Sequence, residues 1–226
     1  MDGAQAEFIV VNEGAVAIKP SNLSKVQAAT VGVPFTTAAL TLRRARAVKG
    51  ETVLVLGANG AVGSAVVQLA RLKGCKVLQG MRSDDGDVNT AADPGLEKVK
   101  ELTGGKGVDV VVDTVGIPAL TKVAVERLGR GGRLAFIAAP RTGGTELGVD
   151  MVGFYRAEKE LVGVNSLLYS VEEMAEILKE LTEGFEKGEL KAAKEGEYQE
   201  VKLQDGVEAY GKAGQKGAGK FVIVTD

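Results

Sequence analysis

A glycine-rich turn near the first quarter of the chain carries the residues best suited to chemistry. The apolar run Thr52-Val-Leu-Val-Leu56 is followed directly by Gly57-Ala-Asn-Gly60-Ala-Val-Gly63, where a helical pattern begins. A helix N-terminus placed there presents free backbone N–H groups, which together with the helix dipole bind phosphate. Ala58-x-Gly60-x-x-Gly63 is an alanine variant of the dinucleotide fingerprint, and its place between strand and helix supports it. The sequence therefore predicts a pyrophosphate site on this turn, with Gly60 admitting the phosphates and Gly63 allowing close packing of the helix.

The end of the following strand indicates which dinucleotide is preferred. NAD enzymes place an acidic residue there, about 20 residues after the glycines, to bond the adenosine ribose. This chain has Met81 at that place, followed by Arg82 and Ser83. A guanidinium suits a 2′-phosphate through charge-assisted hydrogen bonds, so we expect NADP(H). Asp84 and Asp85 leave a second reading open, in which a shifted turn puts a carboxylate on the ribose.

The residue composition excludes several other kinds of chemistry. The chain of 226 residues has no histidine and one cysteine, Cys75. Catalytic zinc usually takes three ligands from His, Cys and carboxylates, so we expect no metal site. Triads that need histidine are excluded.

Charge and hydropathy limit the partners that we expect. The formal net charge is −2, and aromatic residues make up 4% of the chain. No apolar run approaches the roughly 20 residues of a membrane helix, and the N-terminus does not resemble a signal peptide. We therefore expect no membrane and no dedicated nucleic-acid partner. Because the single Cys75 excludes a disulfide framework within the chain, we expect a cytoplasmic protein. The Gly/Lys-rich segment 211–220 has two readings, a solvated loop or a basic contact for phosphate or nucleic acid.

Strands and helices alternate through the middle of the chain. This alternation predicts an α/β fold with a doubly wound parallel (Rossmann) sheet, whose ligands bind at the carboxyl ends of the strands. The expected strands are 52–57, 76–80, 87–89, 108–113, 133–137 and 161–165, and the expected helices between them are 61–73, 94–103, 118–128 and 150–157.

The two ends of the chain lie outside this alternation. We expect two short strands within 7–19 that turn at Glu13-Gly14, a helix 25–30 capped by Ser24, and a helix 35–48. Towards the C-terminus we expect a helix capped by Ser170 that runs to about Lys187, then a strand, helix and strand at 198–203, 205–213 and 220–224.

Several motifs resemble one known group of enzymes. The fingerprint turn, the block Val31-Gly-Val-Pro-Phe-Thr-Thr-Ala38, the block Glu101 to Gly116, Gly131-Gly-Arg-Leu-Ala-Phe-Ile137 and Gly219-Lys-Phe-Val-Ile occur in the matching order. The chain resembles the medium-chain dehydrogenase/reductase superfamily, and within it the zinc-free quinone oxidoreductase (zeta-crystallin-like) group.

The resemblance implies a domain organisation. Residues 31–190 would form the Rossmann domain, while 1–30 and 191–226 would be remnants of a GroES-like catalytic domain, whose larger N-terminal part this chain lacks. Members commonly carry a helix between the second and third strands. Here Arg82 is five residues from Asp87, so we expect that helix to be lost and the adenine pocket to be more open.

The resemblance also implies an activity and a set of binding residues. The activity is NADPH-dependent hydride transfer to a quinone or an α,β-unsaturated carbonyl without zinc, in a homodimer paired through 161–168. No catalytic residue is assigned. By motif position, Gly60, Ala61, Val62 and Gly63 would hold the pyrophosphate, and Asn59 belongs to the same cofactor-binding set. Arg82 and Ser83 would meet the adenosine phosphate of NADP(H), with Asn89 and Gly116 near its adenosine half. The nicotinamide end would be faced by Thr37 and lined by Ala138, Ala139, Pro140, Arg141, Val164, Asn165 and Ser166.

Two alternative functions stay open at this point. Tyr155 and Lys159 have the Tyr-x-x-x-Lys spacing of short-chain reductases, with Thr142 thirteen residues upstream. In that chemistry the lysine lowers the pKa of the tyrosine, which donates the proton. Alternatively, a cofactor-binding half without its catalytic domain could bind NADPH and have no turnover.

Overall fold

The computed structural model describes residues 4–213, 215, 217 and 219–225. It divides the chain into two compact units. We call Thr37–Leu168 the sheet unit, and we call the combination of Met1–Thr36 and Tyr169–Asp226 the terminal unit. The sequence predicts domain boundaries after residues 30 and 190, where remnants of a GroES-like domain would meet the Rossmann domain. These boundaries stay a prediction.

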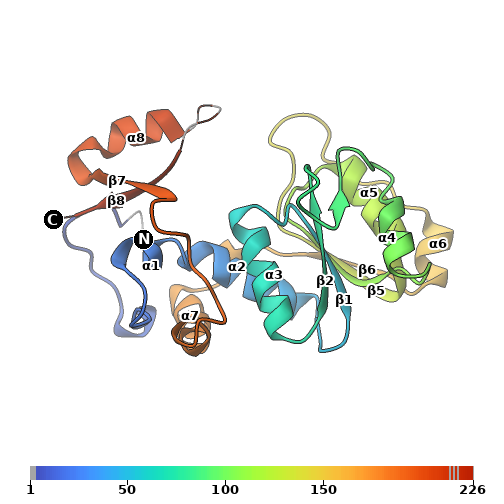
Figure 1. Cartoon of the computed structure of the whole chain (residues 1–226), viewed down its shortest axis with the longest axis horizontal. Coiled ribbons are helices and arrows are strands. Elements are labelled where there is room, and N and C mark those ends of the chain that lie inside the picture. The colour runs from blue at the N-terminus through green and yellow to red at the C-terminus, as the bar shows by residue number, and fades with distance from the viewer. Residues whose placement is uncertain (1–3, 214, 216, 218, 226) are drawn as a thin grey trace. The chain divides into compact units, whose positions relative to one another are not determined.

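The sheet unit contains six parallel strands in the order β3-β2-β1-β4-β5-β6 (Figure 1). Their bounds are β1 Thr52–Leu56, β2 Lys76–Met81, β3 Val88–Asn89, β4 Val108–Asp113, β5 Leu128–Phe136 and β6 Glu160–Gly163. The chain starts in the middle of the sheet, runs to one edge and then returns to the other side of β1. This order confirms the doubly wound fold, and it places a switch point for ligand binding between β1 and β4.

Apolar residues without alternation bury both faces of the central strands. Val53, Leu54, Val55 and Leu56 of β1 are all fully buried. Helix α3 (Ala61–Leu72) packs on β1 and β2. Leu54 and Leu56 belong to a core that also contains residues of α4 (Glu97–Leu102) and α5 (Pro118–Glu126). Continuous apolar strands are typical of parallel sheets covered on both sides.

Helix α2 covers Gly32–Arg44, earlier at both ends than the expected 35–48. Pro34 stands in its first turn, where a missing N–H costs no hydrogen bond. At the other end, Arg133 donates to the carbonyl oxygens of Ala45 (2.8 Å) and Arg46 (3.0 Å). This guanidinium satisfies carbonyls that a helix leaves open at its C-terminus, so the chain can turn away there.

The expected strand pair within 7–19 is wrong. Glu13–Ala15 form a short 3-10 helix (η1), and the flanking residues are not strands. Phe8 and Val10 are 89% and 94% exposed. An alternating apolar pattern makes a strand only where a neighbouring strand accepts its hydrogen bonds, and none does so among the described residues.

Other boundaries differ from the expectation by a few residues. Helix α4 begins at Glu97 rather than Pro94, because Leu96 has a φ of 50° and Asp93 accepts from the Glu97 and Lys98 N–H groups. Strand β5 begins at Leu128, five residues early, through its pairing with Val108 of β4. Strand β6 ends at Gly163 and is followed by the 3-10 turn η2 (Ser166–Leu168).

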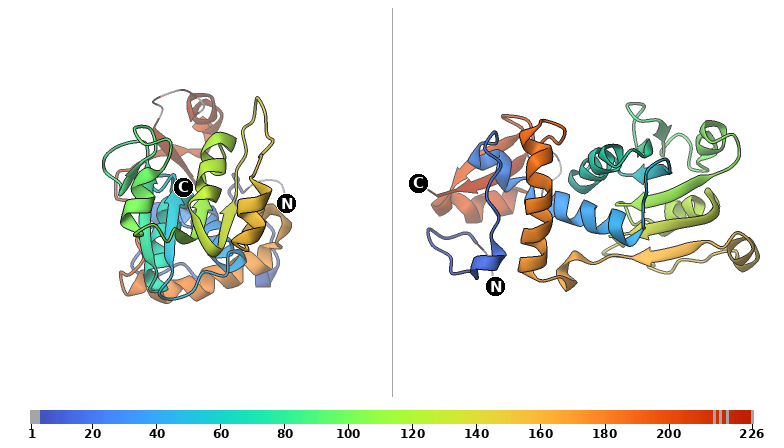
Figure 2. Two further views of the ribbon diagram at one scale, coloured as in Figure 1. Left: turned by 90° about the vertical axis from the view of Figure 1, so that its right-hand side faces the viewer. Right: turned by 90° about the horizontal axis from the view of Figure 1, so that it is seen from below.

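Two connections in the sheet unit matter for the site. Residues 82–87 form turns and bends, so the expected loss of a helix between β2 and β3 is confirmed. Residues 137–150 contain no helix or strand and form the long yellow connection in the left view of Figure 2. They lead to α6 (Met151–Arg156).

The terminal unit is built around α7 (Val171–Glu186). Ser170 caps α7, and Ser24 caps α1 (Lys25–Ala29), each in a reciprocal capping box. Strands β7 (Tyr198–Lys202) and β8 (Lys220–Val224) pair in parallel and are linked through η3 (Leu203–Asp205) and α8 (Gly206–Ala213). Residues 214, 216 and 218 of the Gly/Lys-rich segment lie outside the described residues, so its two readings stay open. Over the described part of the chain, no helix is long and apolar enough to cross a membrane.

Candidate cofactor-binding site

The fingerprint turn has the geometry that a pyrophosphate site needs. Gly57 has a φ of 76°, and its N–H donates to the carbonyl of Gly80 at the end of β2. A Cβ on Gly63 would lie 2.1 Å from the Gly57 carbonyl oxygen, so only glycine lets α3 start this close to β1. Gly60 is the N-cap and provides no side-chain cap. The N–H groups of the first helical turn, Ala61 to Gly63, therefore have no acceptor inside the helix and can bind an anion.

A cavity of about 820 Å³ adjoins this turn at the carboxyl ends of β1, β2 and β4. Three of the expected site residues, Asn59, Gly60 and Arg82, line it. The size and the mainly apolar wall are typical of small-molecule pockets. The other lining residues are Gly57, Gly80, Met81, Thr90, Ala91, Pro94, Thr114, Val115, Ile117, Ala119, Leu120 and Val123.

Most of the apolar wall was not foreseen from the sequence. Ile117, the N-cap residue of α5, lines the cavity together with Leu120 and Val123 of the helix. Their three-residue spacing places them on one helix face, and their position directly after β4 is the signal that could have found them.

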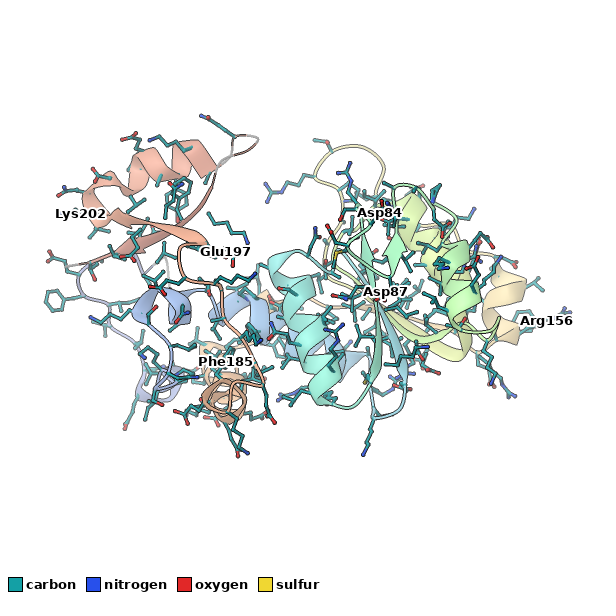
Figure 3. The ribbon with its side chains drawn as sticks, in the orientation of Figure 1. Asp84, Asp87, Arg156, Phe185, Glu197 and Lys202 are labelled. Carbon is teal, nitrogen blue, oxygen red and sulfur yellow. The ribbon has the colours of Figure 1, made fainter. Side chains whose placement is uncertain are left out.

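The loop after β2 leaves one guanidinium unpaired beside three carboxylates. Asp84 accepts from Asn89 Nδ2 (2.8 Å), Asp85 from Ser83 Oγ (2.8 Å) and Asp87 from the Gln79 N–H (2.7 Å). Figure 3 labels Asp84 and Asp87 in this region. Arg82 is exposed and pairs with none of the described residues. Its guanidinium is therefore available to a phosphate, although the neighbouring negative charges reduce that attraction.

The expected residues Ser83 and Asn89 shape this loop. Besides donating to Asp84, Asn89 accepts through Oδ1 from the N–H groups of Ala91 and Ala92. Both side chains thus have local partners, and their contact with an adenosine group stays a prediction.

The turn after β4 adjoins the loop after β5. Gly116 has a φ of 68°, and a Cβ there would lie 2.3 Å from the Ala138 carbonyl oxygen. Ala138 begins the expected nicotinamide-side segment that ends at Arg141. Val164 N–H donates to the Phe136 carbonyl, so the segment Val164 to Ser166 leaves the sheet beside β5. The structure therefore brings these segments to the same sheet edge as the fingerprint turn.

Thr37 carries an unsatisfied hydroxyl. Thr37 is 6% exposed. Within the described part of the chain, its Oγ1 is the one buried side-chain nitrogen or oxygen atom without a hydrogen-bond partner. A buried polar group without a partner costs about 1–3 kcal/mol. Thr37 does not line the cavity described above, and its expected position facing the nicotinamide stays a prediction.

The short-chain alternative is wrong for geometric reasons. Lys159 Nζ donates to the Val125 carbonyl (2.8 Å), while Tyr155 is 64% exposed and contacts Arg156. Lys159 directly precedes the first residue of β6, at the amino edge of the sheet. The fingerprint lies at the carboxyl edge, about 15 Å away for strands of this length. Figure 3 shows Arg156 on α6, well away from Asp84.

Other reactive groups are held in unreactive settings. Cys75 is buried and donates to the Val48 carbonyl (3.3 Å), and burial raises the pKa of its thiol. The described residues contain no group of three His, Cys, Asp or Glu side chains able to hold a metal ion.

Comparison with known proteins agrees with this geometry. Residues 61–183 match the family model described as zinc-binding dehydrogenase. The chain belongs to the zinc-binding dehydrogenase family. This match confirms the resemblance to the medium-chain dehydrogenase/reductase superfamily. Zinc-binding dehydrogenases depend on a nicotinamide dinucleotide, and the glycine turn and its cavity fit that group.

Individual relatives in the zinc-binding dehydrogenase family are longer than this chain. A zinc-type alcohol dehydrogenase-like protein of Schizosaccharomyces pombe is 45% identical over 98% of this chain and 68% of its own length. A quinone oxidoreductase of Rattus norvegicus is 30% identical over 95% of this chain and 69% of its own length. The solved structure of an NAD-dependent alcohol dehydrogenase superposes with a TM-score of 0.79 at 26% sequence identity. The match covers 98% of this chain and 65% of that enzyme's chain. The chain therefore spans about two thirds of each of these proteins.

Proposed function

We propose that this chain binds NADPH and transfers hydride to a quinone or an α,β-unsaturated carbonyl without zinc. The observation that carries the proposal is the cavity of about 820 Å³ joined to a turn where only glycine fits at position 63. The similarity to quinone oxidoreductases supports the substrate class. The absence of histidine and the burial of Cys75 support chemistry without zinc.

Each part of the site has a separate binding role in this proposal. The first-turn N–H groups of α3 hold the pyrophosphate, and Arg82 binds the 2′-phosphate. The apolar face of α5 packs against the adenine, while the segments 138–141 and 164–166 enclose the other end of the cofactor. When bound, the nicotinamide supplies the hydride. The chain's contribution is placement and electrostatics, and solvent supplies the proton.

Titration calorimetry with NADPH and NADH tests the binding half of the proposal. We expect NADPH to bind more tightly, and Arg82→Ala to weaken NADPH about tenfold or more by removing charge-assisted hydrogen bonds. NADH affinity should stay unchanged in the same variant, because NADH has no 2′-phosphate. Equal affinity of the parent chain for both nucleotides would refute the assignment of Arg82.

A second candidate function is an NADPH-binding module without turnover. The residues of the described site have binding roles only in this proposal, and this favours the module. Steady-state oxidation of NADPH with 1,4-benzoquinone separates the two. Measurable turnover supports the reductase, whereas tight binding with no turnover supports the module.

The location and assembly of the protein are part of the same proposal. We propose a cytoplasmic homodimer in which the outer edge of β6 and the segment up to residue 168 pair with a second copy. Leu167 and Leu168 are 89% and 81% exposed, which favours an apolar contact there.

A further inference from the structure

Asp113 ends β4 with a completely buried carboxylate. Its Oδ1 accepts from the N–H groups of Val115 (2.8 Å) and Gly116 (3.0 Å). Its Oδ2 accepts from Thr121 Oγ1 on α5 (2.6 Å). Burying a carboxylate is costly unless its oxygens are hydrogen-bonded, and these three donors supply that stabilisation.

The turn held by Asp113 forms part of the candidate site. Thr114, Val115 and Ile117 all line the cavity. Because both backbone donors to Asp113 lie within this turn, the carboxylate determines the path of the chain between β4 and α5.

The same turn contacts the loops on both of its sides. Thr114 donates through its N–H (3.2 Å) and Oγ1 (2.8 Å) to the Leu56 carbonyl, directly before the fingerprint glycines. A Cβ on Gly57 would lie 2.6 Å from Thr114 Oγ1. On the other side, Gly116 leaves no room for a Cβ beside the Ala138 backbone. A shift of the turn would therefore displace both ends of the dinucleotide site.

We propose that Asp113 is a positioning residue for dinucleotide binding, acting through the turn from Thr114 to Ile117, with Thr121 holding its second oxygen. This inference rests on the proposed function. Asp113 keeps the fingerprint turn, the cavity wall and the loop after β5 in one arrangement, and it touches neither cofactor nor substrate.

The same strand provides a matched control. Asp109, four residues earlier on β4, accepts from the Thr52 N–H (2.7 Å) at the amino edge of the sheet. It also stabilises a neighbouring strand through its carboxylate. A purely structural effect of losing such a carboxylate should appear at both positions, whereas an effect on nucleotide binding should appear only at Asp113.

Calorimetry with NADPH and thermal melting of the variants test the inference. Asp113→Leu removes all three acceptor contacts and should weaken NADPH binding about tenfold or more. Asp113→Asn can still accept from the turn and donate to Thr121, so it should restore most of the affinity. Asp109→Leu should lower the melting temperature but leave the dissociation constant within about twofold of the parent.

Hydrogen exchange adds a readout that needs no cofactor. In Asp113→Leu the amides of Thr114, Val115 and Gly116 should exchange faster than in the parent, whereas in Asp109→Leu they should not. Should Asp113→Leu fail to fold, Thr121→Val removes one donor, and its NADPH affinity and exchange should change in the same direction.

The outcomes separate this inference from the proposed function. If the parent chain binds neither NADPH nor NADH, the proposed function fails, and the positioning role fails with it. If the parent binds NADPH and Asp113→Leu binds it equally well, or Asp109→Leu weakens it equally, the positioning role alone is overturned.

Discussion

At two places in the sheet unit, the local structure depends on particular side chains or on the absence of one. Gly63 is the sharpest case, because the Gly57 carbonyl oxygen occupies the space that any side chain would need. The pair formed by Glu51 and Arg133 is a second case. Arg133 donates to both carboxylate oxygens of Glu51 (2.8 and 2.9 Å) and to backbone carbonyls at the end of α2.

Gly63→Ala should weaken nucleotide binding about tenfold or more and destabilise the chain by about 1–3 kcal/mol, as overpacking does. The Cβ would force α3 away from β1 and displace the first-turn N–H groups. Calorimetry and urea unfolding measure the two effects. Gly211→Ala is the control, because a Cβ there meets nothing within 4 Å and Ala is the better helix former. A Gly63→Ala variant that binds the nucleotide as tightly as the parent would contradict the pyrophosphate site at the first turn of α3.

Glu51→Gln should lower stability at neutral pH by about 1–3 kcal/mol, because it leaves a buried guanidinium without its charged partner. Burial alone would raise the pKa of Glu51, but the hydrogen bonds from Arg133 and the Val48 N–H outweigh it and hold the pKa below the ordinary 4.5.

The lowered pKa of Glu51 also fixes how its contribution depends on pH. A depressed folded-state pKa gives stability that is complete above 4.5 and is lost as pH falls through the folded-state value. Urea unfolding from pH 7 to pH 3 should therefore show the parent and Glu51→Gln curves converging below pH 4.5. A constant difference over this range would contradict the pair's role.

At the scale of the elements, the edge of the sheet at which a segment lies decides whether it can contribute to the candidate site. The fingerprint turn, the loop after β2 and the turn after β4 all leave the carboxyl edge, so parallel strands bring them together. Helix α6 and the start of β6 lie at the amino edge, where Lys159 is held by the Val125 carbonyl. The Tyr-x-x-x-Lys spacing therefore belongs to an element on the wrong side of the sheet for hydride chemistry.

Tyr155→Phe should leave NADPH affinity and any quinone turnover within about twofold of the parent, as expected for an exposed residue away from the site. Steady-state kinetics and calorimetry provide the measurement. Lost turnover with retained binding would revive the short-chain mechanism.

At the scale of the whole molecule, β6 is one of the two edge strands of the six-stranded sheet, and β3 is the other. An unpaired edge with apolar side chains is a template for pairing with another chain. Leu161 of this strand is 38% exposed, and Leu167 and Leu168 follow it at higher exposure.

Leu161→Lys should convert a dimer to a monomer, because a charged residue on an edge strand opposes pairing. Light scattering after size-exclusion chromatography measures the mass. Met151→Lys is the control, since Met151 is 79% exposed on α6 outside the strand. The proposal that β6 pairs with a second copy would be refuted if the parent chain is a monomer, or if the Leu161→Lys variant is still a dimer.

Much of the fold followed from local patterns in the sequence. Local patterns predict strands at the places of β1 and β4, and they predict Ser24 and Ser170 as helix caps. The fingerprint turn was found because its glycines stand between a strand and a helix. These features depend on residues close together in the chain, so the sequence alone determined them.

The tertiary structure decided what depends on distant partners. The strands expected within 7–19 are absent because pairing needs a neighbour that the apolar pattern does not provide. The apolar cavity wall on α5, the restraint of the turn by Asp113 and the exclusion of Tyr155 all depend on which strand ends meet. Strand order is set by the burial of both sheet faces, a property of the assembled sheet that no single segment contains.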